Sequence, residues 1–111
     1  MLMANATETD NPLIGTWSFN VSQAPWEYSR GKVVFEKDKN DILAGKIIFS
    51  SGAELAIPRI TVKDNRLTFE VIIDGYSTKT TATIKDDCLS GYVETYEGNM
   101  PFSANKNVPE D

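Results

Sequence analysis

The chain has 111 residues, 41% of them hydrophobic, and this length and composition predict one globular domain with a substantial core. Its formal net charge of -5, from 16 acidic and 11 basic residues, excludes nucleic acids and anionic membrane surfaces as partners, because both require clustered Lys and Arg. The absence of histidine excludes Ser-His and Cys-His catalytic pairs and histidine-ligated zinc.

The cysteine and the acidic residues also give no indication of a catalytic or metal site. Cys88 is the only cysteine, so it cannot form an intrachain disulfide, and without a histidine partner it is interpreted as a small core or strand residue. The acidic segment 36–41 lacks the ligand spacing and the glycine of a calcium loop. We therefore predict no catalytic residue, no metal site and no cofactor. No apolar run reaches the about 18 residues of a transmembrane helix, so no transmembrane segment is predicted.

The two ends of the chain differ in composition from its middle. Residues 1–13 are predicted to form a flexible N-terminal tail, since positions 4–12 are rich in Asn, Thr, Asp and Glu. Residues 107–111 are predicted to form a C-terminal tail. The composition of the first tail is of the kind left after a signal has been removed, which favours an exported, periplasmic or cell-surface protein whose signal is absent from this chain.

The domain, residues 14–106, shows runs of β-branched and aromatic residues separated by turn clusters at about ten-residue spacing, typical of an all-β sandwich or barrel. In the run 14–21, Trp17, Phe19 and Val21 alternate with polar residues and predict one buried strand face. Further strands are predicted at 31–36, 43–49 and 53–57. Pro58 lacks an N–H group, so an edge, bulge or bend is expected there.

The clearest strand pattern follows at 66–73, with the apolar residues Leu67, Phe69, Val71 and Ile73 on one face. Asp74-Gly75 is a strong two-residue hairpin signal. The remaining strands are predicted at 76–85, 89–95 and 100–106, with turns between them.

About eight strands joined by short loops favour an up-and-down meander. Closing such a meander into a barrel removes its two bare edges, and Gly45 and Gly91 inside strands suit the tight coiling of a small barrel. We therefore predict an all-β fold, a small antiparallel up-and-down β-barrel of about eight strands.

The segment Gly15-Thr16-Trp17 near the start and Lys106 near the end of the last strand resemble the motif of calycin or lipocalin-like barrels. The wider rhythm of the strands resembles small bacterial lipocalin-like domains, which are often exported. The resemblance implies that Gly15, Trp17 and Lys106 close one end of the barrel, with Lys106 packed across the Trp17 ring by a cation–π contact.

Six residues are candidates for ligand binding. Small hydroxyl residues at Thr78 and Thr80 predict a shallow pocket at one end, although a completely filled interior is the alternative that the bulky inward residues favour. Trp26 and Tyr28 lie in the loop 23–31, on the parity opposite to the inward residues of the next strand, and this loop either plugs the barrel mouth or offers an aromatic surface to a ligand. Tyr92 and Tyr96 are expected to point outward as an aromatic platform.

Two functions remain open. The first is a non-catalytic, lipocalin-like binding module for a small amphipathic or hydrophobic ligand at the barrel mouth. The second is an accessory interaction domain that recognises a glycan or a protein partner through surface aromatics. One contiguous exposed patch of Trp26, Tyr28 and the outward tyrosines would favour the second.

Overall fold

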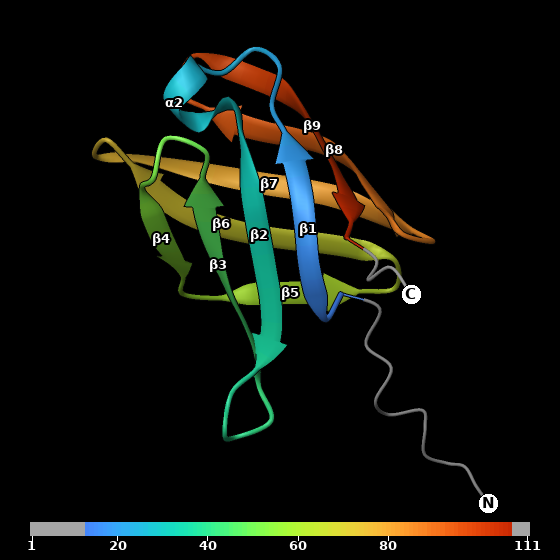
Figure 1. Ribbon diagram of the computed structural model, residues 1–111. Coiled ribbons are helices and arrows are strands. Elements are labelled where there is room, and N and C mark those ends of the chain that lie inside the picture. Colours follow the sequence, from blue (N-terminus) through green and yellow to red (C-terminus); the bar gives the residue numbers. More distant parts are fainter. Residues whose placement is uncertain (1–12, 108–111) are drawn as a thin grey trace, which may run out of the picture.

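The computed structural model describes residues 13–107, which form one antiparallel sheet curled into a nearly closed barrel with a single short helix at its upper end (Figure 1). The all-β barrel predicted from the sequence is confirmed. The elements are β1 (Gly15–Asn20), α2 (Trp26–Ser29), β2 (Arg30–Lys37), β3 (Leu43–Phe49), β4 (Glu54–Ile57), β5 (Ile60–Lys63), β6 (Arg66–Ile73), β7 (Tyr76–Lys85), β8 (Cys88–Thr95) and β9 (Gly98–Lys106). Within residues 13–107, no helix is long and apolar enough to cross a membrane.

The strand order is that of an up-and-down meander, as predicted. The sheet runs β4-β3-β2-β1-β9-β8-β7-β6-β5, so the hydrogen-bonded neighbours in the sheet are neighbours in sequence, with the exception of β1 and β9. The β1–β9 pairing places Trp17 opposite Lys106 and joins the two ends of the meander. Closure in this way satisfies backbone groups that an open sheet would leave bare.

Residues 13–107 contain nine strands where about eight were expected, because one strand is interrupted. Strand β4 pairs with β3, whereas β5 pairs with β6, and Pro58 and Arg59 lie between them. Proline cannot donate to the ladder, so the chain changes its pairing partner at this point, as the position of Pro58 predicted. The remaining seam in the barrel lies between these two short strands.

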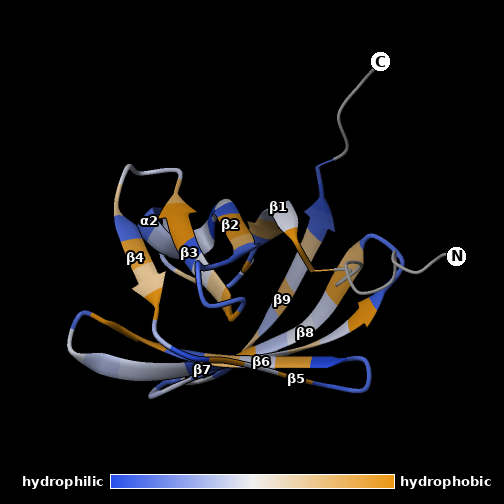
Figure 2. Ribbon diagram, turned by 90° about the horizontal axis from the view of Figure 1, so that it is seen from below, coloured by the Kyte–Doolittle hydropathy of each residue, from blue (hydrophilic) through white to orange (hydrophobic). Residues whose placement is uncertain are grey.

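The core lies inside the barrel and follows the two-residue alternation of the strands. Figure 2 shows this alternation as hydrophobic and hydrophilic bands along the ribbons. On β6, for example, Leu67, Phe69 and Val71 are buried while Arg66 and Glu70 are exposed. Because the period is local, sequence analysis assigns the inward face of this strand correctly.

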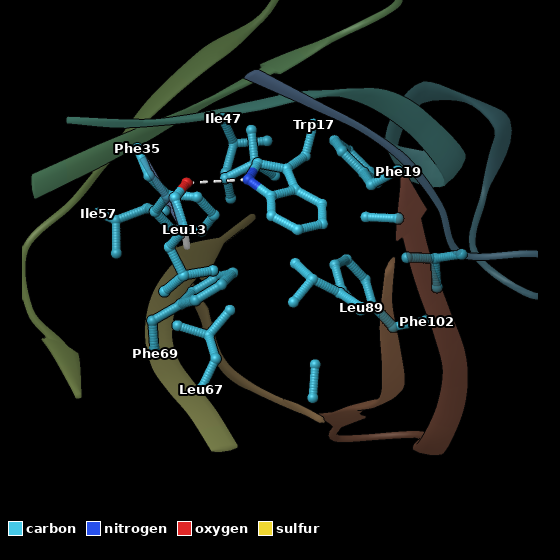
Figure 3. Close-up of a cluster of buried hydrophobic side chains, with 14 of the residues drawn as sticks. Leu13, Trp17, Phe19, Phe35, Ile47, Ile57, Leu67, Phe69, Leu89 and Phe102 are labelled. Carbon is cyan, nitrogen blue, oxygen red and sulfur yellow. Dashed lines mark hydrogen bonds between the residues drawn. The ribbon is translucent and has the colours of Figure 1, made fainter. Parts of the chain in front are cut away.

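The lower end of the barrel is filled by Trp17 and Leu13, both completely buried. The indole Nε1 of Trp17 donates a hydrogen bond to the carbonyl oxygen of Leu13 at 2.9 Å (Figure 3). Leu13 is thus part of the core, and the tail boundary drawn after residue 13 moves to before it. Asn107 is also bound to the barrel, since its amide donates to the Thr16 carbonyl at 2.8 Å. The rest of the two tails predicted from the sequence, 1–12 and 108–111, lies outside the described residues.

Lys106 lies over the Trp17 ring, with its Nζ 5.8 Å from the ring centroid. This distance is within the range of a cation–π contact. Gly15 makes room for the lysine stem, because a Cβ on Gly15 would stand 2.9 Å from Lys106 Cε, and its φ of +135° is unfavourable for other residues. The geometry suits the barrel-closing role that the resemblance implies, which stays a prediction.

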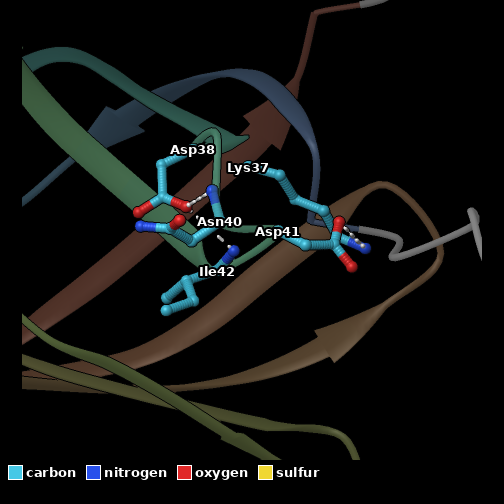
Figure 4. A network of polar contacts seen from close by, with 5 residues as sticks. All are labelled: Lys37, Asp38, Asn40, Asp41 and Ile42. Carbon is cyan, nitrogen blue, oxygen red and sulfur yellow. Dashed lines mark hydrogen bonds and ion pairs between the residues drawn. The ribbon is translucent and has the colours of Figure 1, made fainter.

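The acidic segment 36–41 runs from the end of β2 into the turn that leads to β3 (Figure 4). The Asp38 carboxylate accepts hydrogen bonds from the backbone amides of Asn40 and Ile42 at 2.8 and 3.1 Å. Lys37 and Asp41 form an ion pair at 3.4 Å. The carboxylates of Asp38 and Asp41 therefore hold the turn itself.

Candidate functional site

A cavity of about 220 Å³ occupies the half of the barrel opposite Trp17. It lies below α2 and reaches the β6–β7 and β8–β9 turns, whose residues Asp74 and Glu97 line it. The completely filled interior considered in the sequence analysis is therefore wrong for this half. The hydroxyl residues Thr78 and Thr80 of β7 occupy inward positions where the other strands mostly place larger apolar side chains, which leaves space for the cavity.

The walls are mainly aromatic and aliphatic. The ring of Phe19 packs edge-to-face against Phe49, with centroids 5.9 Å apart, and stacks with Phe102 at 6.2 Å. Phe69, Met100 and several aliphatic side chains, among them Ile47 and Val93, also belong to this apolar lining. Aromatic contacts of this kind fix side-chain positions, so the cavity has a defined shape rather than one that collapses.

Three threonines interrupt the apolar lining, and one of them, Thr95, donates its hydroxyl to the Gly98 carbonyl oxygen at 2.8 Å. Thr78 and Thr80 are 7% and 4% exposed. Thr78 Oγ1 donates a hydrogen bond to the Val71 carbonyl oxygen at 3.1 Å. The Thr80 hydroxyl has no hydrogen-bond partner within residues 13–107. A buried polar group without a partner costs free energy, so this hydroxyl is the most unusual group of the cavity.

Tyr28 covers part of the cavity from the segment between β1 and β2. Pro25 precedes the single turn of α2, and the Tyr28 amide donates to the Pro25 carbonyl at 2.8 Å. The Tyr28 ring packs edge-to-face on Phe49 with centroids 5.1 Å apart, and its hydroxyl donates to the Asp74 carboxylate at 3.1 Å. Tyr28 thus holds the loop over the barrel end.

The placement of Tyr28 corrects the parity argument made from the sequence. Counting back by twos from Phe35 put Tyr28 and Trp26 together on the outward parity. A helical turn replaces that alternation, so Tyr28 is half-buried against the core whereas Trp26 is 74% exposed. The residue that plugs the mouth is therefore Tyr28, and Trp26 points to solvent.

The mouth of the cavity is acidic and aromatic. Asp74 and Glu97 line it from the β6–β7 and β8–β9 turns, and Tyr76 and Tyr96 stack between these turns with centroids 4.1 Å apart. The hydrogen bond to Asp74 raises the pKa of Tyr28, with burial and the charges of Asp74 and Glu27 adding to the effect. The negative charge of Glu97 is the first cause that raises the pKa of Tyr96. Both phenols therefore stay protonated beside carboxylates.

The structure brings together four of the six binding residues predicted from the sequence. Tyr28, Thr78, Thr80 and Tyr96 all line the cavity, whereas Trp26 and Tyr92 do not.

Tyr92 lies in mid-strand on β8, opposite Thr81 and Pro101, and is 39% exposed. Tyr28 turns inward while Trp26 points to solvent, so these residues do not make one contiguous aromatic surface.

Asp74, Tyr76 and Glu97 were interpreted from the sequence only as turn or strand residues. The strong hairpin signal at Asp74-Gly75 places Asp74 at one end of the barrel. The sequence around Asp74 does not indicate that the loop with Tyr28 covers the same end. Elsewhere, Cys88 is a strand residue, the second of the two possibilities considered for it, and is exposed at the start of β8, where its thiol donates to Asn105 Oδ1 at 3.2 Å. Within residues 13–107, no three Cys, Asp or Glu side chains are grouped closely enough to hold a metal ion.

Comparison with solved structures places this fold beside a known barrel. A mutant of the fluorescent protein UnaG matches 86% of this chain and 96% of its own, with a TM-score of 0.53 and 14% sequence identity. The likeness establishes the fold. No protein-family model matches the chain, and no curated protein sequence matches it. The finer resemblance to small bacterial lipocalin-like domains stays a prediction.

Proposed function

We propose that this barrel is a binding module that holds a small, largely apolar molecule in the cavity below α2 and carries out no reaction on it. The cavity of about 220 Å³ is smaller than the roughly 300–1,000 Å³ of pockets for drug-sized ligands. At about 30 Å³ for each group of the size of a water molecule, it holds about seven nonhydrogen atoms. A short alkyl chain or a single ring meets this limit.

The observation that carries the proposal is the Thr80 hydroxyl, 4% exposed and without a partner within residues 13–107, in a mainly apolar wall. Burial of a hydroxyl without a hydrogen bond costs about 1–3 kcal/mol. A polar atom at the inner end of a ligand would recover that cost. In a purely structural core, valine at this position would avoid the cost, because it has nearly the same shape and no hydroxyl. The ligand therefore has an apolar body that fits between Phe19, Phe49 and Phe69.

The covering segment gives the ligand a route in and out. The Tyr28 side chain is held over the cavity by one ring contact with Phe49 and by hydrogen bonds to Asp74. The backbone of α2, which has only four residues, is tied to the barrel by the Val21 amide, which donates to the Ser29 carbonyl at 2.7 Å, and by the Ser51 hydroxyl, which donates to the Glu27 carbonyl at 3.1 Å. A short helical turn without a side-chain cap on its N-terminus has little stability of its own. Opening of the Tyr28 contacts would uncover the cavity while the strands remain paired.

Titration with heptanol, followed by backbone amide shifts in NMR spectra, tests the proposal. Heptanol matches the size of the cavity, and we expect shifts at residues around it, such as Val71 and Met100, with none at the end that contains Trp17. Val93→Phe fills the cavity and should abolish these shifts. Val62→Phe makes the same change on β5, at a residue 39% exposed that does not line the cavity, and should keep them. Uniform shifts, or no binding, would refute the proposal.

A further inference from the structure

The charged groups that line the cavity are all acidic. Asp74 and Glu97 belong to its lining, and within the described residues no lysine or arginine does. Glu27 of α2 adds a third negative charge near enough to Tyr28 to raise the pKa of that phenol. A negative group placed at this mouth would meet repulsion from Asp74 and Glu97, whereas a positive group would be attracted by both.

Asp74 can accept more hydrogen bonds than it receives. Its two oxygens offer about four acceptor sites, and within residues 13–107 the Tyr28 hydroxyl is the side chain that donates to them, at 3.1 Å to each oxygen. Tyr28 remains a donor because its pKa is raised, so it orients the carboxylate without neutralising it. Acceptor sites remain for a donor on a ligand.

The two stacked tyrosines add an aromatic surface to the same place. Tyr76 and Tyr96 lie nearly parallel, with 19° between their ring planes, and both line the cavity. Faces of aromatic rings attract cations, and the attraction is strongest where water is partly excluded. Carboxylates and ring faces together favour an ammonium group over both a hydroxyl and a carboxylate.

Thr80 provides an independent indication that a ligand occupies this cavity. Its hydroxyl is more than nine-tenths buried, lines the cavity and has no partner within the described residues. Thr80 is four residues below Tyr76 on β7, which at about 3.3 Å per residue is roughly 13 Å along the strand. The acidic mouth and the hydroxyl therefore lie at opposite ends of one apolar space.

We propose that the ligand is a cationic amphiphile, whose ammonium group lies at the mouth between Asp74, Glu97 and the Tyr76–Tyr96 pair and whose apolar body extends through the cavity to a polar atom beside the Thr80 hydroxyl. This inference rests on the proposed function, because it identifies the chemical class of the ligand for the same cavity. The binding of carboxylates is disfavoured by the same groups.

Calorimetric titration with three probes that share one apolar tail tests the inference: heptylammonium, heptanol and octanoate, each with a heptyl chain. We expect heptylammonium to bind most tightly and octanoate most weakly. Asp74→Asn and Glu97→Gln should each weaken heptylammonium binding about fivefold and leave heptanol binding nearly unchanged, as expected for the loss of one attractive charge. Rising salt should weaken the binding of heptylammonium alone.

Asp64→Asn is the matched control for Asp74→Asn. Both aspartates begin a hairpin turn with positive φ, 59° and 54°, which asparagine also tolerates, but Asp64 does not line the cavity. The control should leave the preference for heptylammonium intact. Glu70→Gln, at an exposed position of β6, is the matched control for Glu97→Gln and should likewise leave the preference for heptylammonium intact.

The outcomes separate the two proposals. Octanoate or heptanol binding as tightly as heptylammonium would overturn the cationic class while leaving the binding function in place. A preference for heptylammonium that survives Asp74→Asn and Glu97→Gln would also overturn it, because the groups named would not be responsible. Absence of binding by all three probes would refute the binding function itself. If a variant does not fold, the salt dependence of the unmodified protein decides: equal responses of heptylammonium and heptanol would contradict the inference.

Discussion

Replacement of Thr80 by valine should stabilise the protein, in spite of the removal of a polar group from a β-strand. Valine has nearly the shape of threonine and suits a strand equally well. The change removes a hydroxyl that is 4% exposed and has no partner in residues 13–107. Since an unpaired buried hydroxyl costs about 1–3 kcal/mol, we expect the free energy of unfolding to rise by about 1 kcal/mol.

Thr78→Val is the matched control, two residues away on the same strand and the same face. Its hydroxyl is also buried but donates to the Val71 carbonyl oxygen at 3.1 Å. The loss of this hydrogen bond should lower the free energy of unfolding by about 0.5–1.5 kcal/mol. The two substitutions, identical in chemistry, should therefore change the stability in opposite directions.

Equilibrium unfolding in urea, followed by tryptophan fluorescence, measures both changes. For a domain of this size, 1 kcal/mol corresponds to a shift of about 4–8 °C in Tm, which thermal unfolding resolves independently. Destabilisation of Thr80→Val by as much as Thr78→Val would show that the Thr80 hydroxyl is satisfied in the free protein, and the argument for a ligand at this position would fail.

Three further predictions concern the covering segment and the closed end. Tyr28 has a raised pKa, so the stability that its bond to Asp74 contributes is present below the ordinary tyrosine pKa of about 10 and is lost as the pH rises through the folded value. Above about pH 10, the free energy of unfolding in urea should therefore fall more steeply for the parent protein than for Tyr28→Phe. Parallel pH profiles of the two proteins would contradict this. Lys106→Met keeps the stem but removes the charge 5.8 Å from the Trp17 centroid, and should lower the free energy of unfolding by about 0.5–1 kcal/mol, with unchanged stability as the opposing result. Trp26→Ala removes a side chain that is 74% exposed and should alter stability by less than about 0.5 kcal/mol, so a large loss in the same assay would assign the plug to Trp26 after all.

The parts of the fold that sequence analysis predicts are those governed by local rules. Alternation along 66–73 identifies the buried face of β6, Asp74-Gly75 identifies the turn that follows it, and Pro58 identifies the break between β4 and β5. Each of these signals depends only on a few neighbouring residues. The alternation reflects the pleat of a strand, Asp74-Gly75 reflects the dihedral angles of the turn, and Pro58 reflects the missing amide donor. Pairing along a meander follows from them, because consecutive strands with short turns become neighbours.

The candidate site could be predicted only in part, because its residues meet through contacts distant in sequence. Thr78 and Thr80 were identified as small inward residues on one strand. Asp74 and Tyr28 are separated by 46 positions, and the hydrogen bond between them depends on the curvature of the whole sheet. The inward position of Tyr28 also depends on one turn of helix, in which the strict alternation of inward and outward residues along a strand no longer holds.

The pairing of β1 with β9 has a consequence for how the protein is made. Residues 17 and 106 are opposite each other, so β1 finds one of its two partners only after β9, whose paired residue lies 89 positions further along the chain, has been synthesised. Until then, β1 and β8 each present a bare edge, and the cavity lacks the Phe102 wall. Closure over so long a loop is slow in comparison with hairpin formation. During synthesis the chain therefore passes through an open sheet whose unpaired edges can pair with other chains, so aggregation competes with the final closure.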